Sequence, residues 1–134
     1  MNSPTDGSHQ LLRSAAVLEV SSRTMQPMID YFVNQLGFSV GSIAGSGPSF
    51  AKLDRDGQTI MLNCTSHWFG IRRTRDWAAY FWVNDIEAIY SEFVTSGAKL
   101  KGAITEKPYG CNEVVAIAPD GREIVFGQLV QSHD

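Results

Sequence analysis

The chain repeats one pattern of residues, and this internal duplication constrains the fold more than any other feature of the sequence. The segments Leu53–Asn63 (LDRDGQTIMLN) and Ile117–Gly127 (IAPDGREIVFG) each place an Asp-Gly pair between two strand-like runs. Asp-Gly between apolar runs is typical of a β-hairpin turn, because glycine adopts positive φ without a steric cost. The sequence therefore predicts two equivalent hairpins whose turns lie 64 residues apart.

A strand followed by a helix is predicted before each hairpin. The segments Ala15–Ser21 (AAVLEVS) and Ala78–Asn84 (AAYFWVN) read as strands. Apolar residues recur at helical spacing in Met25–Leu36 and in Asp85–Ser96, and a glycine follows each of these segments. A glycine in this position ends a helix in the left-handed conformation. Each half of the chain is thus expected to contain one strand, one helix and one hairpin, in this order.

Weaker strands are expected directly after the helices, at Phe38–Ala44 and Ala98–Ile104, so the predicted order of elements is β-α-β-β-β, twice. The fold class is α+β, with two βαβββ modules forming curved mixed sheets around a cavity. A chain of 134 residues is long enough to bury a core without a disulfide or a metal. The expected boundaries are a flexible N-terminal tail (1–13), a first module (14–63), a linker (64–77), a second module (78–130) and a C-terminal tail (131–134).

Composition and charge exclude several classes of function. The formal net charge of −3 argues against a nucleic-acid partner, which requires clustered Lys and Arg to neutralise phosphates. No apolar run approaches the roughly 18 residues of a membrane helix, so no membrane partner is expected. Residues 1–13 lack the apolar core of a signal peptide. We therefore expect a cytoplasmic protein in which Cys64 and Cys111 are reduced thiols.

Alternation along the predicted strands divides their side chains between a face that packs under the helix and a face that lines the cavity. In the first strand of the second module, Phe81 is expected under the helix, whereas Tyr80 and Trp82 face the cavity. In the equivalent strand of the first module, Glu19 faces the cavity. The other positions expected to face the cavity are Ala15, Val17, Thr59, Met61, Asn63, Ala78, Glu123, Val125 and Gly127. The pattern does not fix the faces of the strands at 50–53 and 113–117.

Aromatic and acidic side chains near the expected cavity are the candidate ligand contacts. Aromatic rings can form a stacking wall for a planar ligand and can attract a cation, although they can also fill the core or contact a second protomer. Buried carboxylates can hold a cationic group or act as a general base, although on a strand they can also be solvated or paired with a basic residue. The candidate ligand-binding residues are Glu19, Trp68, Tyr80, Trp82, Tyr109 and Glu113.

Three motifs of this chain resemble the vicinal oxygen chelate superfamily, which includes glyoxalase I, extradiol dioxygenases and bleomycin-resistance proteins. They are DYFVNQLGF (30–38), VNDIEAIYSEFVTSGA (83–98) and KPYGCNEVVAIAPDGREIVFGQ (107–128). They follow the superfamily's order, and the resemblance covers residues 14–130. It implies paired βαβββ modules, in agreement with the internal repeat.

The same resemblance implies where a metal would bind. Enzymes of the superfamily hold a divalent metal in the cavity with His, Glu or Gln at four positions, at the start of the first strand and the middle of the last strand of each module. In this chain these positions are Ala15, Met61, Ala78 and Val125, none of which offers an oxygen or imidazole ligand. The sequence therefore predicts no metal and no other cofactor, and it is most similar to the metal-free, bleomycin-resistance-like branch.

The leading hypothesis is a homodimer that binds a small aromatic or cationic molecule without a metal, as in drug sequestration and antibiotic resistance. A dimer is expected because a module with one helix leaves one face of its sheet uncovered. One alternative is a vicinal oxygen chelate enzyme (a lyase, isomerase or dioxygenase) that uses an atypical metal site, with ligands such as Glu19 and Glu113, or a carboxylate base. Another is a regulatory module that binds a metabolite. The sequence leaves open whether the modules pair within one chain or between two.

Overall fold

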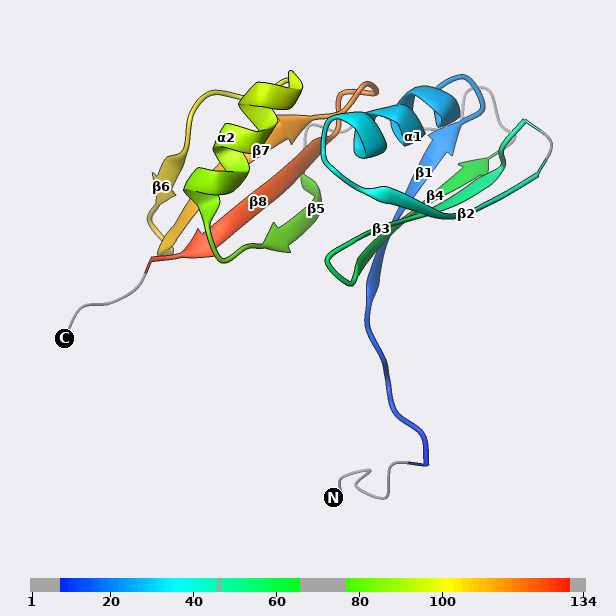
Figure 1. Ribbon diagram of the computed structural model, residues 1–134, viewed down its shortest axis with the longest axis horizontal. Coiled ribbons are helices and arrows are strands. Elements are labelled where there is room, and N and C mark those ends of the chain that lie inside the picture. Colours follow the sequence, from blue (N-terminus) through cyan, green and yellow to red (C-terminus); the bar gives the residue numbers. More distant parts are fainter. Residues whose placement is uncertain (1–7, 46, 66–76, 131–134) are drawn as a thin grey trace.

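The computed structural model describes residues 8–45, 47–65 and 77–130, which form two modules of one helix and four strands each (Figure 1). The first module contains β1 (Ala15–Ser21), α1 (Met25–Asn34), β2 (Ser39–Ala44), β3 (Phe50–Arg55) and β4 (Gln58–Thr65). The second contains β5 (Trp77–Trp82), α2 (Ile86–Ser96), β6 (Thr105–Lys107), β7 (Cys111–Ile117) and β8 (Glu123–Leu129). The predicted α+β class and the repeated βαβββ order are confirmed.

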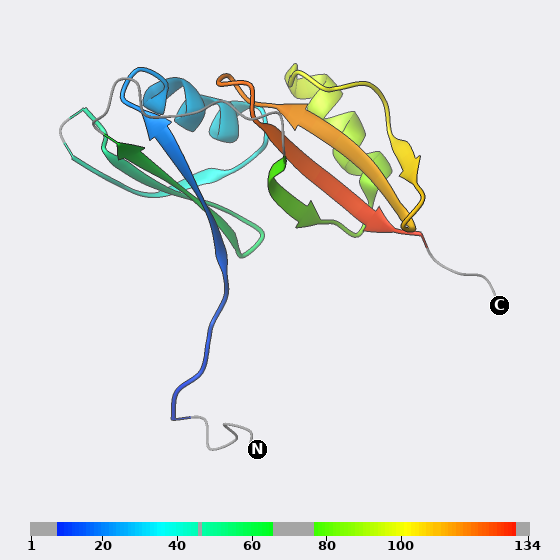
Figure 2. The ribbon, with the colours of Figure 1, turned by 180° about the vertical axis from the view of Figure 1, so that it is seen from behind.

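Both modules have the same sheet topology. The strand orders are β1-β4-β3-β2 and β5-β8-β7-β6. In each sheet the first pair is parallel and the other pairs are antiparallel. The modules lie side by side, and each helix covers one face of its own sheet (Figures 1 and 2). In the described part of the chain the two sheets remain separate and do not close into a barrel, so each has a face without a helix.

Both predicted Asp-Gly hairpins are present, but their turns differ. Between β3 and β4, Asp56 (φ 52°) and Gly57 (φ 78°) both adopt positive φ, as a two-residue turn of type I′ requires. Between β7 and β8 the connection is longer, and of the pair only Gly121 (φ 91°) has positive φ. Asp120 accepts a hydrogen bond from the Arg122 backbone N–H at 3.1 Å in that turn. The same dipeptide therefore closes a tight turn in one module and a wider one in the other.

The weaker strand predicted at Ala98–Ile104 is wrong. Residues of this segment exchange two backbone hydrogen bonds with β7, from Lys101 N to the Val115 carbonyl (2.9 Å) and from Ile117 N to the Lys99 carbonyl (2.8 Å). Gly102 then adopts φ 93°, a conformation that a regular strand excludes. The chain therefore bends away from β7, and the short strand β6 begins only at residue 105.

The helix-facing sides of both sheets form the core. The predicted alternation is confirmed, because the residues expected under the helices are buried on β1, β4 and β8. Their buried members are Leu18, Val20, Ile60, Leu62, Ile124 and Phe126. The two strands whose faces the pattern left open place Ala51, Leu53, Val114 and Ala116 on the same side. The ring centroids of Phe38 and Phe81 lie 5.7 Å apart, and this contact joins the cores of the two modules.

Polar contacts also hold the two modules together within one chain. Arg55 at the end of β3 donates hydrogen bonds of 2.7 and 2.8 Å to the two carboxylate oxygens of Glu92 on α2. Ser96 donates to the Gln35 carbonyl at 2.7 Å, and the Arg122 guanidinium donates to the Glu19 carbonyl. These contacts, with the shared core, fix the position of β5 relative to the β3–β4 turn. None of the helices in the described ranges is long and apolar enough to span a bilayer.

Candidate functional site

A row of three aromatic rings runs along the uncovered face of β5. The Tyr80 ring centroid lies 5.4 Å from that of Trp77 and 4.7 Å from that of Trp82. Phe81 points to the opposite face, where it stacks on Phe126 at 5.5 Å. The predicted alternation of Tyr80 and Trp82 with Phe81 is therefore confirmed. Trp77 is 49% and Trp82 62% exposed, so both indoles are available to a ligand.

Tyr80 reaches across the sheet from β5 to β7. In the register of the second sheet, Gly127 of β8 lies between Trp82 of β5 and Glu113 of β7. The Tyr80 side chain lies over this glycine, and its hydroxyl donates a hydrogen bond of 2.8 Å to Glu113 Oε2. A Cβ atom at position 127 would overlap Tyr80 Oη and would lie 2.6 Å from Tyr80 Cζ. Only glycine at this position therefore lets Tyr80 contact Glu113.

Glu113 is a buried carboxylate whose two oxygens differ in their hydrogen bonding. The side chain is 1% exposed. Its Oε2 accepts a second hydrogen bond from the Tyr109 hydroxyl at 2.6 Å. Its Oε1 has no hydrogen-bond partner among the residues that the structure describes. No Lys, Arg or His of those residues forms an ion pair with it.

Both tyrosines are held in their protonated, donating form. Tyr109 is 56% exposed as a whole residue. Desolvation, together with the hydrogen bond to Glu113 and the negative charge of Glu113, raises the pKa of Tyr109 to about 12. Burial and the hydrogen bond to Glu113 likewise raise the pKa of Tyr80 well above its usual range. At neutral pH both hydroxyls are therefore donors, and Glu113 Oε2 is their acceptor.

Glu113 also lines a small cavity of about 140 Å³ on the uncovered face of the second sheet. The other lining residues are Trp77, Lys101, Ala103, Thr105, Lys107, Val115 and Glu123. Glu123, the second acidic residue of this cavity, is paired with the Lys101 ammonium at 2.9 Å. Among the described residues, the cavity thus contains one carboxylate that forms an ion pair and one, Glu113, that forms none, although Lys107 also lines the cavity.

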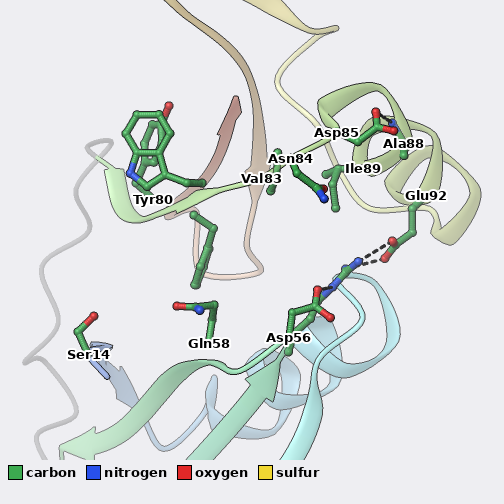
Figure 3. Close-up of a pocket in the computed structure, with 13 residues that line it drawn as sticks. Ser14, Asp56, Gln58, Tyr80, Val83, Asn84, Asp85, Ala88, Ile89 and Glu92 are labelled. Carbon is green, nitrogen blue, oxygen red and sulfur yellow. Dashed lines mark hydrogen bonds and ion pairs between the residues drawn. The ribbon is translucent and has the colours of Figure 1, made fainter. Parts of the chain in front are cut away.

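A larger cleft of about 730 Å³ lies between the modules, along the free edge of β5 (Figure 3). Its volume is within the range of small-molecule sites. Ser14, Asp56 and Gln58 lie on one wall and Tyr80, Val83 and Asn84 on the other, with the Arg55–Glu92 pair at one end. Trp82 lines the cleft as well. Because Tyr80 lines the cleft and hydrogen-bonds Glu113, the aromatic row connects the cleft with the small cavity.

The structure brings together four of the six candidate residues, namely Tyr80, Trp82, Tyr109 and Glu113. Glu19 lies apart from them, exposed on β1, and lines none of the cavities described above. Trp68 lies outside the described residues.

Trp77 is the residue that sequence reasoning missed. The sequence pattern assigns Trp77 to the linker, but it is the first residue of β5 and lies opposite Glu123. A register shift between Trp77 and Ala79 breaks the two-residue period, so alternation counted back from Tyr80 could not find it.

Solved structures with the same fold include proteins that bind antibiotics. The antibiotic-binding protein TnmS3 from Streptomyces sp. CB03234 is 17% identical, with a TM-score of 0.66, and the match covers 90% of this chain and 99% of that one. The bleomycin-binding protein of Streptomyces verticillus, solved with copper(II)-bleomycin, is 19% identical, also at 0.66, over 92% and 99%. A glyoxalase/bleomycin resistance protein/dioxygenase superfamily member from Sphaerobacter thermophilus is 18% identical at 0.65, over 89% and 98%.

These likenesses confirm the fold that the sequence motifs implied. No protein-family model matches the chain, and no curated protein does.

The residues at the superfamily's four metal positions do not fit a metal. Ala15, Met61, Ala78 and Val125 offer no oxygen or imidazole donor from their side chains, and Val125 is fully buried. Across the described ranges, no group of three or more His, Cys, Asp and Glu residues is placed to hold a metal ion. The chemistry of the site is therefore that of stacking rings, hydroxyl donors and a carboxylate acceptor.

Proposed function

We propose that this protein binds a small aromatic or cationic molecule without a metal. The observation that carries the proposal is the aromatic row of Trp77, Tyr80 and Trp82, which lies directly beside the buried carboxylate of Glu113. Exposed indole rings offer a flat, polarisable surface to a planar ligand, and a cation over such a ring gains about 0.5–2 kcal/mol. A hydrogen bond to a charged group adds about 1.5–3 kcal/mol.

Drug sequestration is the role that this site supports best. Sequestration requires only that the ligand is enclosed, and a cleft of about 730 Å³ has room for a drug-sized ring system. Two of the proteins with the same fold are described as binding an antibiotic or bleomycin, which supports the proposal by analogy of fold.

A second candidate function is an enzyme that uses a carboxylate base. The two tyrosines fix Glu113 through Oε2, so Oε1 remains the oxygen that can accept a proton. Mass spectrometry of a ligand recovered after prolonged incubation separates the two functions. An unchanged ligand supports sequestration, whereas catalytic conversion supports the enzyme.

We also propose that the protein acts as a homodimer. Several large apolar side chains are exposed on the single chain, including Leu11 (98%), Leu12 (86%) and Val17 (54%). The segment that precedes β1 extends away from both modules (Figure 1). Exposed apolar groups of this kind often mark a contact surface. Sedimentation velocity should give a dimer, and the double variant Leu11→Ser, Leu12→Ser should dissociate more readily. A monomer at every concentration tested would contradict the proposal.

Native mass spectrometry of protein purified without added ligand or chelator tests the main proposal. The expected spectrum contains a dimer, a small organic molecule in part of the population, and no stoichiometric metal. About one zinc, nickel, iron or manganese ion per chain would refute metal-independent binding and would favour the enzyme.

A further inference from the structure

We infer that Glu113 provides the counter-charge for a protonated nitrogen of the ligand, so that the bound molecule is a planar ring with a short ammonium or amidinium arm. This inference rests on the proposed binding function and deepens it by naming the ligand class. The ring stacks on Trp77 and Tyr80, and the nitrogen pairs with Glu113.

The first step of the argument is the missing partner of a buried charge. Glu113 and Glu123 are the buried acidic residues among those that the structure describes. Glu123 has the Lys101 ammonium at 2.9 Å, whereas Glu113 is more deeply buried and has only the two neutral hydroxyls. A buried carboxylate without a counter-charge is costly, and native proteins normally pair such groups. The free-energy cost of burying the Glu113 carboxylate without a counter-charge is removed when a ligand cation binds beside it.

The second step is the fixed orientation of the carboxylate. Both tyrosines donate to the same oxygen, Oε2, and this leaves Oε1 empty. The Tyr80 side chain is itself positioned by packing against the backbone of Gly127, where there is no Cβ atom. Its hydroxyl therefore keeps Glu113 in place before any ligand arrives. An acceptor that is oriented in advance loses little entropy on binding, which favours the ligand donor that meets it.

The third step is the space around the carboxylate. The cavity of about 140 Å³ that Glu113 lines has room for a head group of a few non-hydrogen atoms, but not for the ring as well. Trp77 lines the same cavity and its ring lies 5.4 Å from that of Tyr80, so a planar ring attached to the head group meets these two rings. Because Oε1 is buried in the free protein, a side chain that covers it must shift before the ligand nitrogen reaches it.

Two matched probes and two matched variants test the inference. The probes are 2-naphthylmethylammonium and 2-naphthylmethanol, which share the ring and differ in the charge of the arm. The variants are Glu113→Gln and Glu123→Gln, which remove one negative charge each from the same cavity. Isothermal titration calorimetry at neutral pH should show that the wild type prefers the ammonium by about tenfold or more. Glu113→Gln should abolish this preference and leave the affinity for the alcohol within about threefold, whereas Glu123→Gln should retain the preference.

The possible failures are distinguishable. Equal affinity for the two probes in the wild type, or a preference that survives in Glu113→Gln or is equally lost in Glu123→Gln, would overturn this inference and leave the proposed function intact. Absence of binding by both probes at millimolar concentration would overturn the proposed function itself. If Glu113→Gln does not fold, the inference is tested by the salt dependence of the affinity of the wild type for 2-naphthylmethylammonium. A buried pair should lose less than about threefold in affinity between roughly 0.1 and 1 M salt, whereas a larger loss would indicate a surface charge.

Discussion

The replacement of Gly127 by alanine should destabilise the protein through a single neighbour, Tyr80. The backbone of Gly127 is not in the left-handed region, so alanine can adopt it and even restricts the unfolded chain, which favours folding by about 0.4–1 kcal/mol. The new Cβ atom, however, would overlap the Tyr80 hydroxyl and lie 2.6 Å from Cζ. The ring must therefore lift away from β8 and lose its hydrogen bond to Glu113.

The cost follows from these two effects. A lost hydrogen bond to a buried charged group costs about 1.5–3 kcal/mol. The strain of an added methyl group in a packed site costs about 1–3 kcal/mol. After subtraction of the gain from the unfolded chain, we expect Gly127→Ala to lower the free energy of unfolding by about 1.5–5.5 kcal/mol. For a chain of this length the melting temperature should fall by roughly 10 °C.

A double-mutant cycle with Tyr80→Ala is the control. Urea denaturation should be measured for the wild type, for both single variants and for the double variant. With Tyr80 truncated, the methyl group at position 127 has no ring to displace, so its cost should fall below about 0.5 kcal/mol. An equal cost of Gly127→Ala in both backgrounds would refute the reasoning, because the clash would then involve another neighbour.

Four further predictions follow from the structure. Trp77→Ala should weaken the binding of 2-naphthylmethylammonium about tenfold without unfolding the protein, because it removes an indole on which the ring stacks, whereas Phe81→Ala should cost about 3 kcal/mol of stability, as measured by fluorescence titration and thermal melting. Arg55→Met should remove the link to Glu92 and lower the free energy of unfolding in urea by about 1 kcal/mol, because both side chains are partly solvated. The pKa of Tyr109 is raised from its usual value of 10.0 to about 12, so its contribution to stability should be constant below pH 10 and decline between pH 10 and 12, where the unfolded chain ionises first. Elemental analysis should find no stoichiometric divalent metal, and a chelator should leave the melting temperature unchanged.

The fold was predictable because its signals are local. Each signal depends on fewer than about 15 residues: the two Asp-Gly pairs, the two helical periods and the glycines that follow the helices. Because these signals occur twice in the same sequence order, they predict the order of the elements. The prediction of a strand at Ala98–Ile104 was wrong because it also used only local signals. The positive φ of Gly102, which ends the pairing with β7, depends on how the chain follows β7 rather than on the neighbours of Gly102 in the sequence.

The site was less predictable because it depends on three strands at once. Alternation correctly placed Tyr80 and Trp82 on the uncovered face of β5. It could not fix the face of the strand at 113–117, so the contact between Tyr80 and Glu113 required the register of β5, β8 and β7 together. Gly127 has no side chain to mark its role, and Trp77 joins the row only through an irregularity of register. Local patterns in the sequence do not by themselves fix the register between strands that lie far apart in the chain.

The repeat also explains why the candidate site lies in one module. By the 63- and 64-residue offsets of the duplication, Tyr80 corresponds to Val17, Trp82 to Glu19, and Gly127 to Asn63. The two sheets therefore have the same topology, but the uncovered face of the first carries no equivalent of the aromatic row. Val17 is 54% exposed there, which is unfavourable for an apolar side chain that has no partner. In the proposed dimer, a second chain would cover the exposed apolar side chain of Val17 on the first module. That second chain would also carry its own aromatic row and its own Glu113.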